Sequence, residues 1–196
     1  MKSASFRTLA TWCAFLAGIA GLLYALSFVI LQNTLLSALF LLLGGVASVV
    51  VWTGLYAHLH DIEAPFPLLA LLLSVGAASG SIIHGGYDLA NAIHPPATIN
   101  QDLPSAIDPR GLLTFGLGCL GLLVFAWLIA RDRALPSALA YLGYASAALM
   151  AVLYLGRLII LQATNPVIVI AAVLEGFLLN PIWLIWLGIA FRRLRN

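Results

Sequence analysis

The sequence predicts an all-α polytopic membrane protein: a compact bundle of six transmembrane helices with both termini in the cytoplasm. The 196-residue chain is 63% hydrophobic and only 8% charged, and its mean hydropathy is +1.07. Apolar runs alternate with short polar segments along its whole length, and its basic residues gather at alternate connections. Soluble domains carry about a quarter charged residues, so this composition argues against a soluble enzyme, a nucleic-acid binder or a disordered chain.

The first two helices come from one long apolar stretch. No charged residue occurs between Arg7 and Asp61, whereas a single transmembrane helix needs only about 20 apolar residues. The polar triplet Gln32-Asn33-Thr34 divides the stretch. We therefore expect helices over 8–31 and 35–57.

A polar loop over 58–65 separates the second helix from the third. Pro65 and Pro67 suit the first turn of a helix, where a missing N–H costs little. The third helix is expected over 66–91. A polar connection over 92–108 follows it.

Two of the last three helices begin at recognisable signals. Asp108-Pro109 and Asn165-Pro166 each combine a capping side chain with a proline at the first helical position. Arg131, Asp132 and Arg133 separate two of the helices. The three helices are expected over 109–130, 135–161 and 166–191. Residues 1–196 thus form one transmembrane domain.

The basic residues predict the orientation of the bundle, because they favour the cytoplasmic side of short loops. With six helices, both termini lie on one side, and seven basic residues fall there against two toward the other. The seven are Lys2, Arg7, Arg131, Arg133, Arg192, Arg193 and Arg195, and the two are Arg110 and Arg157. Both termini are therefore expected in the cytoplasm and the 92–108 connection outside.

Polar side chains form a stripe on the third helix. The stripe begins at Ser81 and continues three, seven and ten residues later with His84, Asp88 and Asn91. This spacing places the four side chains on one helical face. One interpretation is the wall of an outward-facing polar pocket in which Asp88 holds His84 in one tautomer. In the other, Asp88 and Asn91 lie among lipid headgroups and His84 is an ordinary buried histidine.

Glu175 is the most deeply placed charge in the sequence. It follows nine helical residues, which puts it about 13 Å below the outer surface. A carboxylate at that depth needs a cation or a proton. Arg157 is expected about 9 Å below the same surface, so we predict an Arg157–Glu175 pair, either as a structural ion pair or as part of a substrate or proton site.

Three functions fit this sequence. The first is an integral membrane protein that binds a small or amphiphilic ligand in the outward pocket, or serves as a subunit of a membrane complex. The second is a small secondary transporter or proton-linked carrier using Glu175, Arg157 and His84. The third is a metal-dependent membrane enzyme acting on lipids through His84 and Asp88.

The remaining expectations go with the first of these functions, which is the leading hypothesis. No catalytic residue set, metal site or cofactor is predicted, because the sequence lacks clustered metal ligands and nucleotide-binding motifs. Membrane lipids are the expected surroundings, and no nucleic-acid partner is expected. The predicted location is the cell membrane, which the chain crosses several times.

Overall fold

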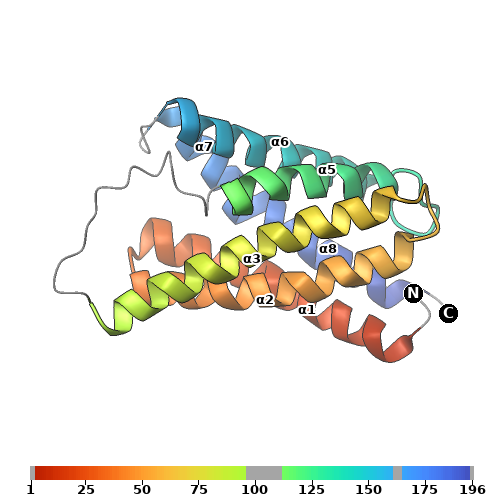
Figure 1. The fold of residues 1–196 in the computed structure, drawn as a ribbon, viewed down its shortest axis with the longest axis horizontal. Helices are drawn as coiled ribbons and strands as arrows, with labels where there is room; N and C mark the ends of the chain where they lie inside the picture. Colours follow the sequence, from red (N-terminus) through yellow and green to blue (C-terminus); the bar gives the residue numbers. More distant parts are fainter. Residues whose placement is uncertain (1–2, 96–111, 161–164, 195–196) are drawn as a thin grey trace.

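The computed structural model of this chain describes residues 3–95, 112–160 and 165–194. Within those ranges the chain forms six helical rods and no strand (Figure 1). The predicted all-α fold of six helices is therefore confirmed. Arg7 Nη1 donates a hydrogen bond of 2.7 Å to the Leu194 carbonyl, so the first rod begins beside the end of the last.

The first three rods correspond to the first three helices predicted from the sequence. Each of the first two starts at a capping side chain: Ser3 accepts from the Phe6 N–H at 3.3 Å, and Asn33 accepts from the Leu36 N–H at 3.0 Å. Such caps satisfy a backbone donor that has no helical partner. The rods are α1 (Ala4–Ala25) continued by the wider π-helical turn η1 (Leu26–Ile30), α2 (Thr34–Leu59) and α3 (Phe66–Ile93).

The other three rods include two further π-helical segments. Asn165 caps the last rod by accepting from the Val167 N–H at 3.0 Å, as its sequence signal predicts. The predicted cap at Asp108 lies outside the described residues. The rods are η3 (Leu112–Leu117) with α5 (Gly118–Ile129), then α6 (Ser137–Ile159), and finally α7 (Pro166–Leu174), η4 (Glu175–Leu179) and α8 (Asn180–Arg193).

Five of the six rods are long and apolar enough to cross a membrane. The rod containing α5 is shorter, with an apolar helix over Leu113–Ile129 in the described part of the chain. Large apolar side chains cover the outside of the bundle: Trp12 is 67% exposed, Leu72 64% and Ile159 74%. This surface is compatible with an integral membrane protein, because lipid tails cover apolar side chains at no cost.

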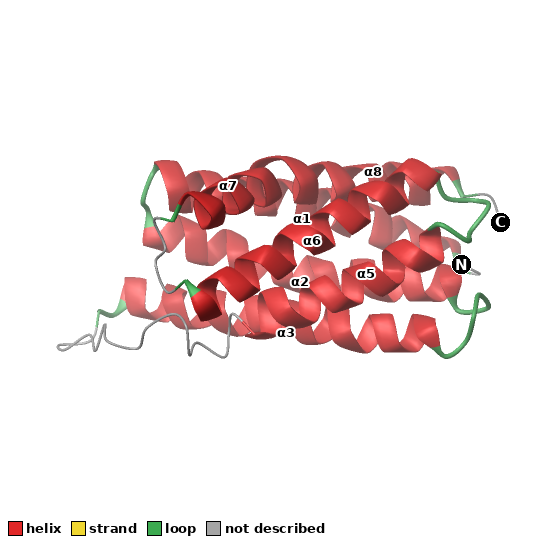
Figure 2. Cartoon of the chain, turned by 90° about the horizontal axis from the view of Figure 1, so that it is seen from above, coloured by secondary structure: helices red, strands yellow, loops and turns green. Residues whose placement is uncertain are grey.

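The six rods form a ring. Consecutive rods pack side by side, and α8 closes the ring against α1. Figure 2 shows the rods running along one direction, with the connections at the two ends. We call the end where α1 begins and α8 finishes the basic end, and the opposite end the far end. The described basic side chains at the basic end are Arg7, Arg131, Arg133, Arg192 and Arg193.

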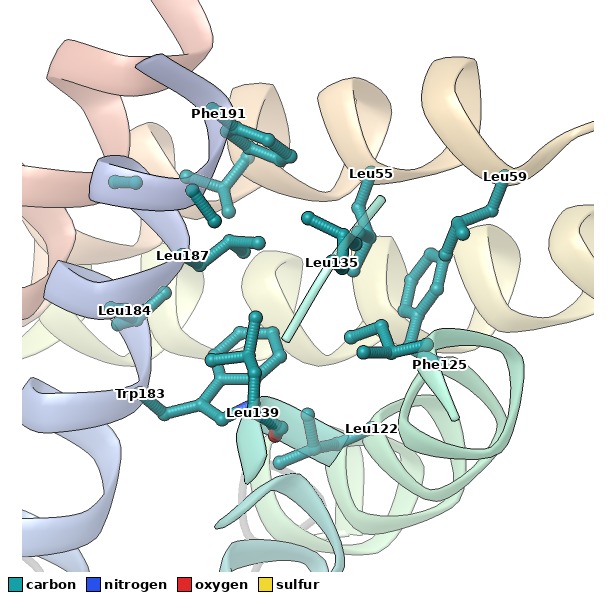
Figure 3. Packing of buried hydrophobic residues seen from close by; sticks show 14 of the residues in the cluster. Leu55, Leu59, Leu122, Phe125, Leu135, Leu139, Trp183, Leu184, Leu187 and Phe191 are labelled. Carbon is teal, nitrogen blue, oxygen red and sulfur yellow. The ribbon is translucent and has the colours of Figure 1, made fainter. Parts of the chain in front are cut away.

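The main hydrophobic core lies in the half of the ring nearer the basic end. Figure 3 shows how its large side chains pack together. The Trp52 ring lies 5.7 Å from that of Phe125 and 5.5 Å from that of Trp183. Trp183 Nε1 also donates to the Leu139 carbonyl at 3.0 Å, which satisfies its one polar atom. A second, smaller cluster of Leu153, Ile168 and Ala171 lies toward the far end. This half of the ring therefore has less apolar filling and leaves room for polar groups.

Two glycines allow α3 to approach its neighbours closely. A Cβ added at Gly85 would lie 2.6 Å from the Leu42 backbone nitrogen and 2.8 Å from the Ala38 carbonyl oxygen of α2. A Cβ at Gly121 of α5 would lie 2.9 Å from the Ser74 backbone nitrogen. Small residues at such contacts are how helices associate where lipid provides no hydrophobic drive. They fix α3 between α2 and α5.

Candidate functional site

His84 and Asp88 form a polar pair in the half of α3 nearer the far end of the bundle. His84 Nε2 lies 2.9 Å from Asp88 Oδ2, and the two side chains are 23% and 32% exposed. Residues four apart are neighbours on one helical face, so the helix itself creates this contact. The carboxylate thereby orients the imidazole ring, as the spacing in the sequence predicts.

A pocket of about 210 Å³ opens beside this pair. Its opposite wall comes from the end of the first rod, the turn that follows, and the start of α2. The apolar part of the lining consists of Tyr24, Phe28, Ala38 and Leu41, and the polar part adds Gln32, Asn33, Thr34 and Ser37 to His84 and Asp88. Three consecutive rods thus surround one mixed polar and aromatic space.

The aromatic wall is a stacked pair. The Tyr24 and Phe28 ring centroids are 5.7 Å apart, with 16° between the ring planes. Phe28 is 61% exposed, so the pocket lies next to the outer surface of the bundle. The faces of aromatic rings carry partial negative charge and attract cations. The Asp88 carboxylate lines the same pocket as these two rings.

Gln32 occupies the turn at the mouth of the pocket in an unusual backbone conformation. Its φ is +48°, in the left-handed region that a residue with a side chain adopts at a cost of roughly 1–2 kcal/mol. The turn holds it there: the Leu31 N–H bonds to the Leu26 carbonyl at 3.0 Å and the Asn33 N–H to the Ser27 carbonyl at 2.9 Å. Backbone strain of this kind clusters at ligand sites.

Ser81 and Asn91, the other members of the predicted stripe, are not among the residues that line this pocket. The Ser81 hydroxyl donates to the Ala77 carbonyl of its own helix at 3.5 Å. Asn91 lies in the last turn of α3, where its side chain is half-buried. The structure thus brings two of the four stripe residues into the pocket.

Glu175 lies in the interior of the bundle, away from the pocket. It is 7% exposed, and its Oε1 accepts a 2.6 Å hydrogen bond from the hydroxyl of Ser146, which is 1% exposed. Its Oε2 has no hydrogen-bond partner among the described residues. Glu175 also opens the π-helical segment η4, in which the Asn180 N–H bonds to the Glu175 carbonyl. Segments of this kind inside α-helices are frequent at functional sites.

The predicted partner of Glu175 cannot be compared with the structure directly, because the Arg157 side chain lies outside the described residues. The backbone of α6 gives the relevant spacing. Ser146 and Arg157 are eleven residues apart in this helix, which corresponds to about 16 Å along its axis. Ser146 is the described partner of Glu175, and the Arg157–Glu175 pair stays a prediction.

The pocket and Glu175 lie on different sides of the first rod. Tyr24 lines the pocket, whereas the next residue, Ala25, packs against Gly176, where an added Cβ would lie 3.1 Å from the Ala25 Cβ. The predicted site residues therefore do not converge on one cavity in the described structure. His84 and Asp88 belong to the pocket, and Glu175 belongs to a separate buried site on the other side of the first rod.

Several residues of both sites were missed by the sequence reasoning. The sequence indicates that the Gln32-Asn33-Thr34 triplet separates two helices, and this is the only role predicted for it. Polar residues next to membrane-spanning helices are also candidates for a binding site. Ser146 carries a clearer signal: it is the polar member of an inward-facing series, Leu139, Gly143, Ser146, Met150 and Leu153, with helical spacing. A polar residue in such a series indicates a buried partner.

The metal-dependent alternative receives no support from the described part of the chain, where no group of three or more histidine, cysteine, aspartate or glutamate side chains is placed to hold an ion. No protein-family model, curated protein or solved structure matches this chain.

Proposed function

We propose that this protein is a multi-pass protein of the cell membrane that binds an amphiphile with a positively charged headgroup in the pocket between α1, α2 and α3. The observation that carries the proposal is the His84–Asp88 pair, 2.9 Å apart, which lines the same pocket as the stacked rings of Tyr24 and Phe28. A carboxylate and aromatic rings that line one pocket are the kinds of group that bind ammonium ions.

The location of the pocket favours a ligand that belongs to the membrane. The basic end carries the described arginines, and basic loops favour the cytoplasm, so the far end and its pocket face outward in this proposal. Large apolar side chains flank the pocket on the surface: Ile30 is 63% exposed, Leu31 55% and Leu35 43%. They would contact an acyl chain while the headgroup occupies the pocket.

The size of the pocket also favours a headgroup. Its volume of about 210 Å³ is below the roughly 300–1,000 Å³ of sites that enclose a drug-sized ligand. A small polar group fits, whereas the rest of an amphiphile has to remain outside. A lipid or lipid-like molecule satisfies both conditions, because its tail stays in the bilayer.

The proposal is tested by lipid retention. The full chain is reconstituted in nanodiscs that contain equal amounts of phosphatidylcholine and phosphatidylglycerol. The lipids that stay bound to the protein after it is released from the nanodiscs are identified by native mass spectrometry. We expect the choline lipid to be retained preferentially. Asp88→Asn should reduce that preference about tenfold, because it removes the carboxylate charge that attracts the quaternary ammonium of choline.

Asp61→Asn is the matched control. Asp61 also contacts a histidine, His60, at 3.1 Å, but it is 84% exposed and lies at the basic end. This variant removes the same charge without touching the pocket, so it should retain lipids as the wild type does. Equal retention of the two lipids by the wild type, or an unchanged preference in Asp88→Asn, contradicts the proposal.

A further inference from the structure

The interior of the bundle contains a second polar site that the ligand pocket does not explain. Glu175 opens η4 after the nine residues of α7, so it lies about 13 Å from the far end of its rod. Its carboxyl group is covered on all sides, with 7% of the residue exposed. The Ser146 hydroxyl, 2.6 Å from Oε1, is its hydrogen-bond partner.

One neutral hydroxyl leaves this carboxyl group poorly compensated. A carboxylate has about four lone-pair sites, and here Oε2 has no hydrogen-bond partner among the described residues. Burying an ionised carboxylate without a counter-charge costs several kcal/mol even after relaxation. A positive charge must therefore accompany Glu175 in the bundle.

The elements packed around Glu175 supply no described cation near it. η4 contacts α1 and α6 and continues α7 and α8. Ionisable groups on those elements are Arg7, Cys13 and Tyr24 of α1, Tyr141, Tyr144 and Tyr154 of α6, and Arg192 and Arg193 of α8. The three arginines of this set lie at the basic end. The remaining basic residue on these elements is Arg157, whose side chain lies outside the described residues. Its predicted ion pair with Glu175 is the alternative explanation for this site.

The backbone that follows Glu175 has a shifted hydrogen-bonding pattern. Pro181 has no N–H, and in η4 the bonding register is shifted so that the Asn180 N–H bonds to the Glu175 carbonyl. One carbonyl of the Gly176–Phe177 pair is therefore left without its helical donor. Carbonyls freed in this way coordinate small cations in membrane transporters.

We infer that Glu175 and Ser146 form a binding site for a small monovalent cation, either a proton or a sodium ion, inside the bundle. This site is separate from the amphiphile pocket and goes beyond the function proposed for it. A proton would occupy Oε2 directly, whereas a sodium ion would bind the carboxylate and the Ser146 hydroxyl. Either occupant neutralises the buried charge.

Infrared spectroscopy and thermal unfolding of the full chain in nanodiscs at neutral pH distinguish the two occupants. If the occupant is a proton, the spectrum contains a carboxylic-acid band that Glu175→Gln removes and Ser146→Ala shifts, and sodium has no effect on either measurement. If it is sodium, the acid band is missing. Sodium chloride then raises the unfolding temperature of the wild type relative to choline chloride, and Ser146→Ala weakens the apparent sodium affinity about tenfold.

Ser146→Ala also keeps the experiment decisive if Glu175→Gln fails to fold, because it retains the carboxyl group. An ionised Glu175 with no sodium response overturns the inference. The ion-pair rival makes its own prediction: Glu175→Gln and Arg157→Gln each destabilise the protein strongly, and the double variant recovers much of the loss. That result also overturns the inference, while leaving the amphiphile pocket untouched.

Discussion

His58, at the end of α2, lies 2.8 Å from Asp132 in the α5–α6 connection, measured from Nε2 to Oδ2. The same carboxylate oxygen accepts a 3.0 Å hydrogen bond from the Leu135 N–H. The side chains of His58 and Asp132 are only 13% and 12% exposed. Asp132 therefore joins two rods that are not consecutive in the sequence and also shapes the turn before α6.

The first prediction is that Asp132→Ala destabilises the bundle. The change removes both contacts and leaves the Leu135 N–H without its acceptor, so we expect a loss of about 1–3 kcal/mol in the free energy of unfolding. Unfolding by heat or denaturant in one detergent provides the measurement. Asp61→Asn, at the same end but 84% exposed, should change stability by no more than about 0.5 kcal/mol. Equal stability of Asp132→Ala and the wild type contradicts the structural role.

The second prediction concerns adjacent glycines of α3. A Cβ at Gly85 would meet the Leu42 nitrogen and the Ala38 carbonyl oxygen of α2 at 2.6 and 2.8 Å, whereas a Cβ at Gly86 has nothing within 4 Å. Gly85→Ala should therefore cost about 1–3 kcal/mol through overpacking. Gly86→Ala should be neutral, or stabilising by up to about 1 kcal/mol, because alanine favours the helix. Thermal unfolding of the two variants compares them, and similar values for both would exclude the close α2–α3 contact.

The third prediction separates stability from binding at Gln32. Glycine adopts a φ of +48° without the steric cost that a side chain imposes. Gln32→Gly should therefore keep or raise the unfolding temperature. It also removes an amide from the pocket lining, so retention of phosphatidylcholine should fall several-fold. A lower unfolding temperature, or wild-type retention, would show that the turn or the pocket differs from this account.

The fourth prediction concerns orientation. Cysteines are introduced singly at Asp61, at the basic end, and at His94, at the far end, in a chain carrying Cys13→Ser and Cys119→Ser. A membrane-impermeant thiol reagent added to intact cells should label His94→Cys, because basic loops remain in the cytoplasm. Asp61→Cys should react only after permeabilisation. Labelling in the opposite order would place both termini outside and the pocket in the cytoplasm.

Much of the architecture is present in the sequence because each span depends on local chemistry. The lack of charge between Arg7 and Asp61 predicts apolar helices long enough to cross a membrane, and Asn165-Pro166 begins a helix wherever that segment lies. The predicted starts of the second, third and sixth helices, at 35, 66 and 166, fall within one residue of the observed Thr34, Phe66 and Pro166. The His84–Asp88 contact is equally local, since both residues belong to one helical turn.

The tertiary structure decided which helical faces meet. Helical spacing shows that Ser146 and Glu175 each lie on an inward face, but only the packing of α6 against the last rod brings them within 2.6 Å. In the same way, the η1–α2 turn supplies the pocket wall opposite His84. In lipid, contacts between rods depend on close fit at small residues such as Gly85 rather than on removing apolar surface from water. Periodicity along a single helix cannot specify that fit, because it depends on the shapes of two surfaces.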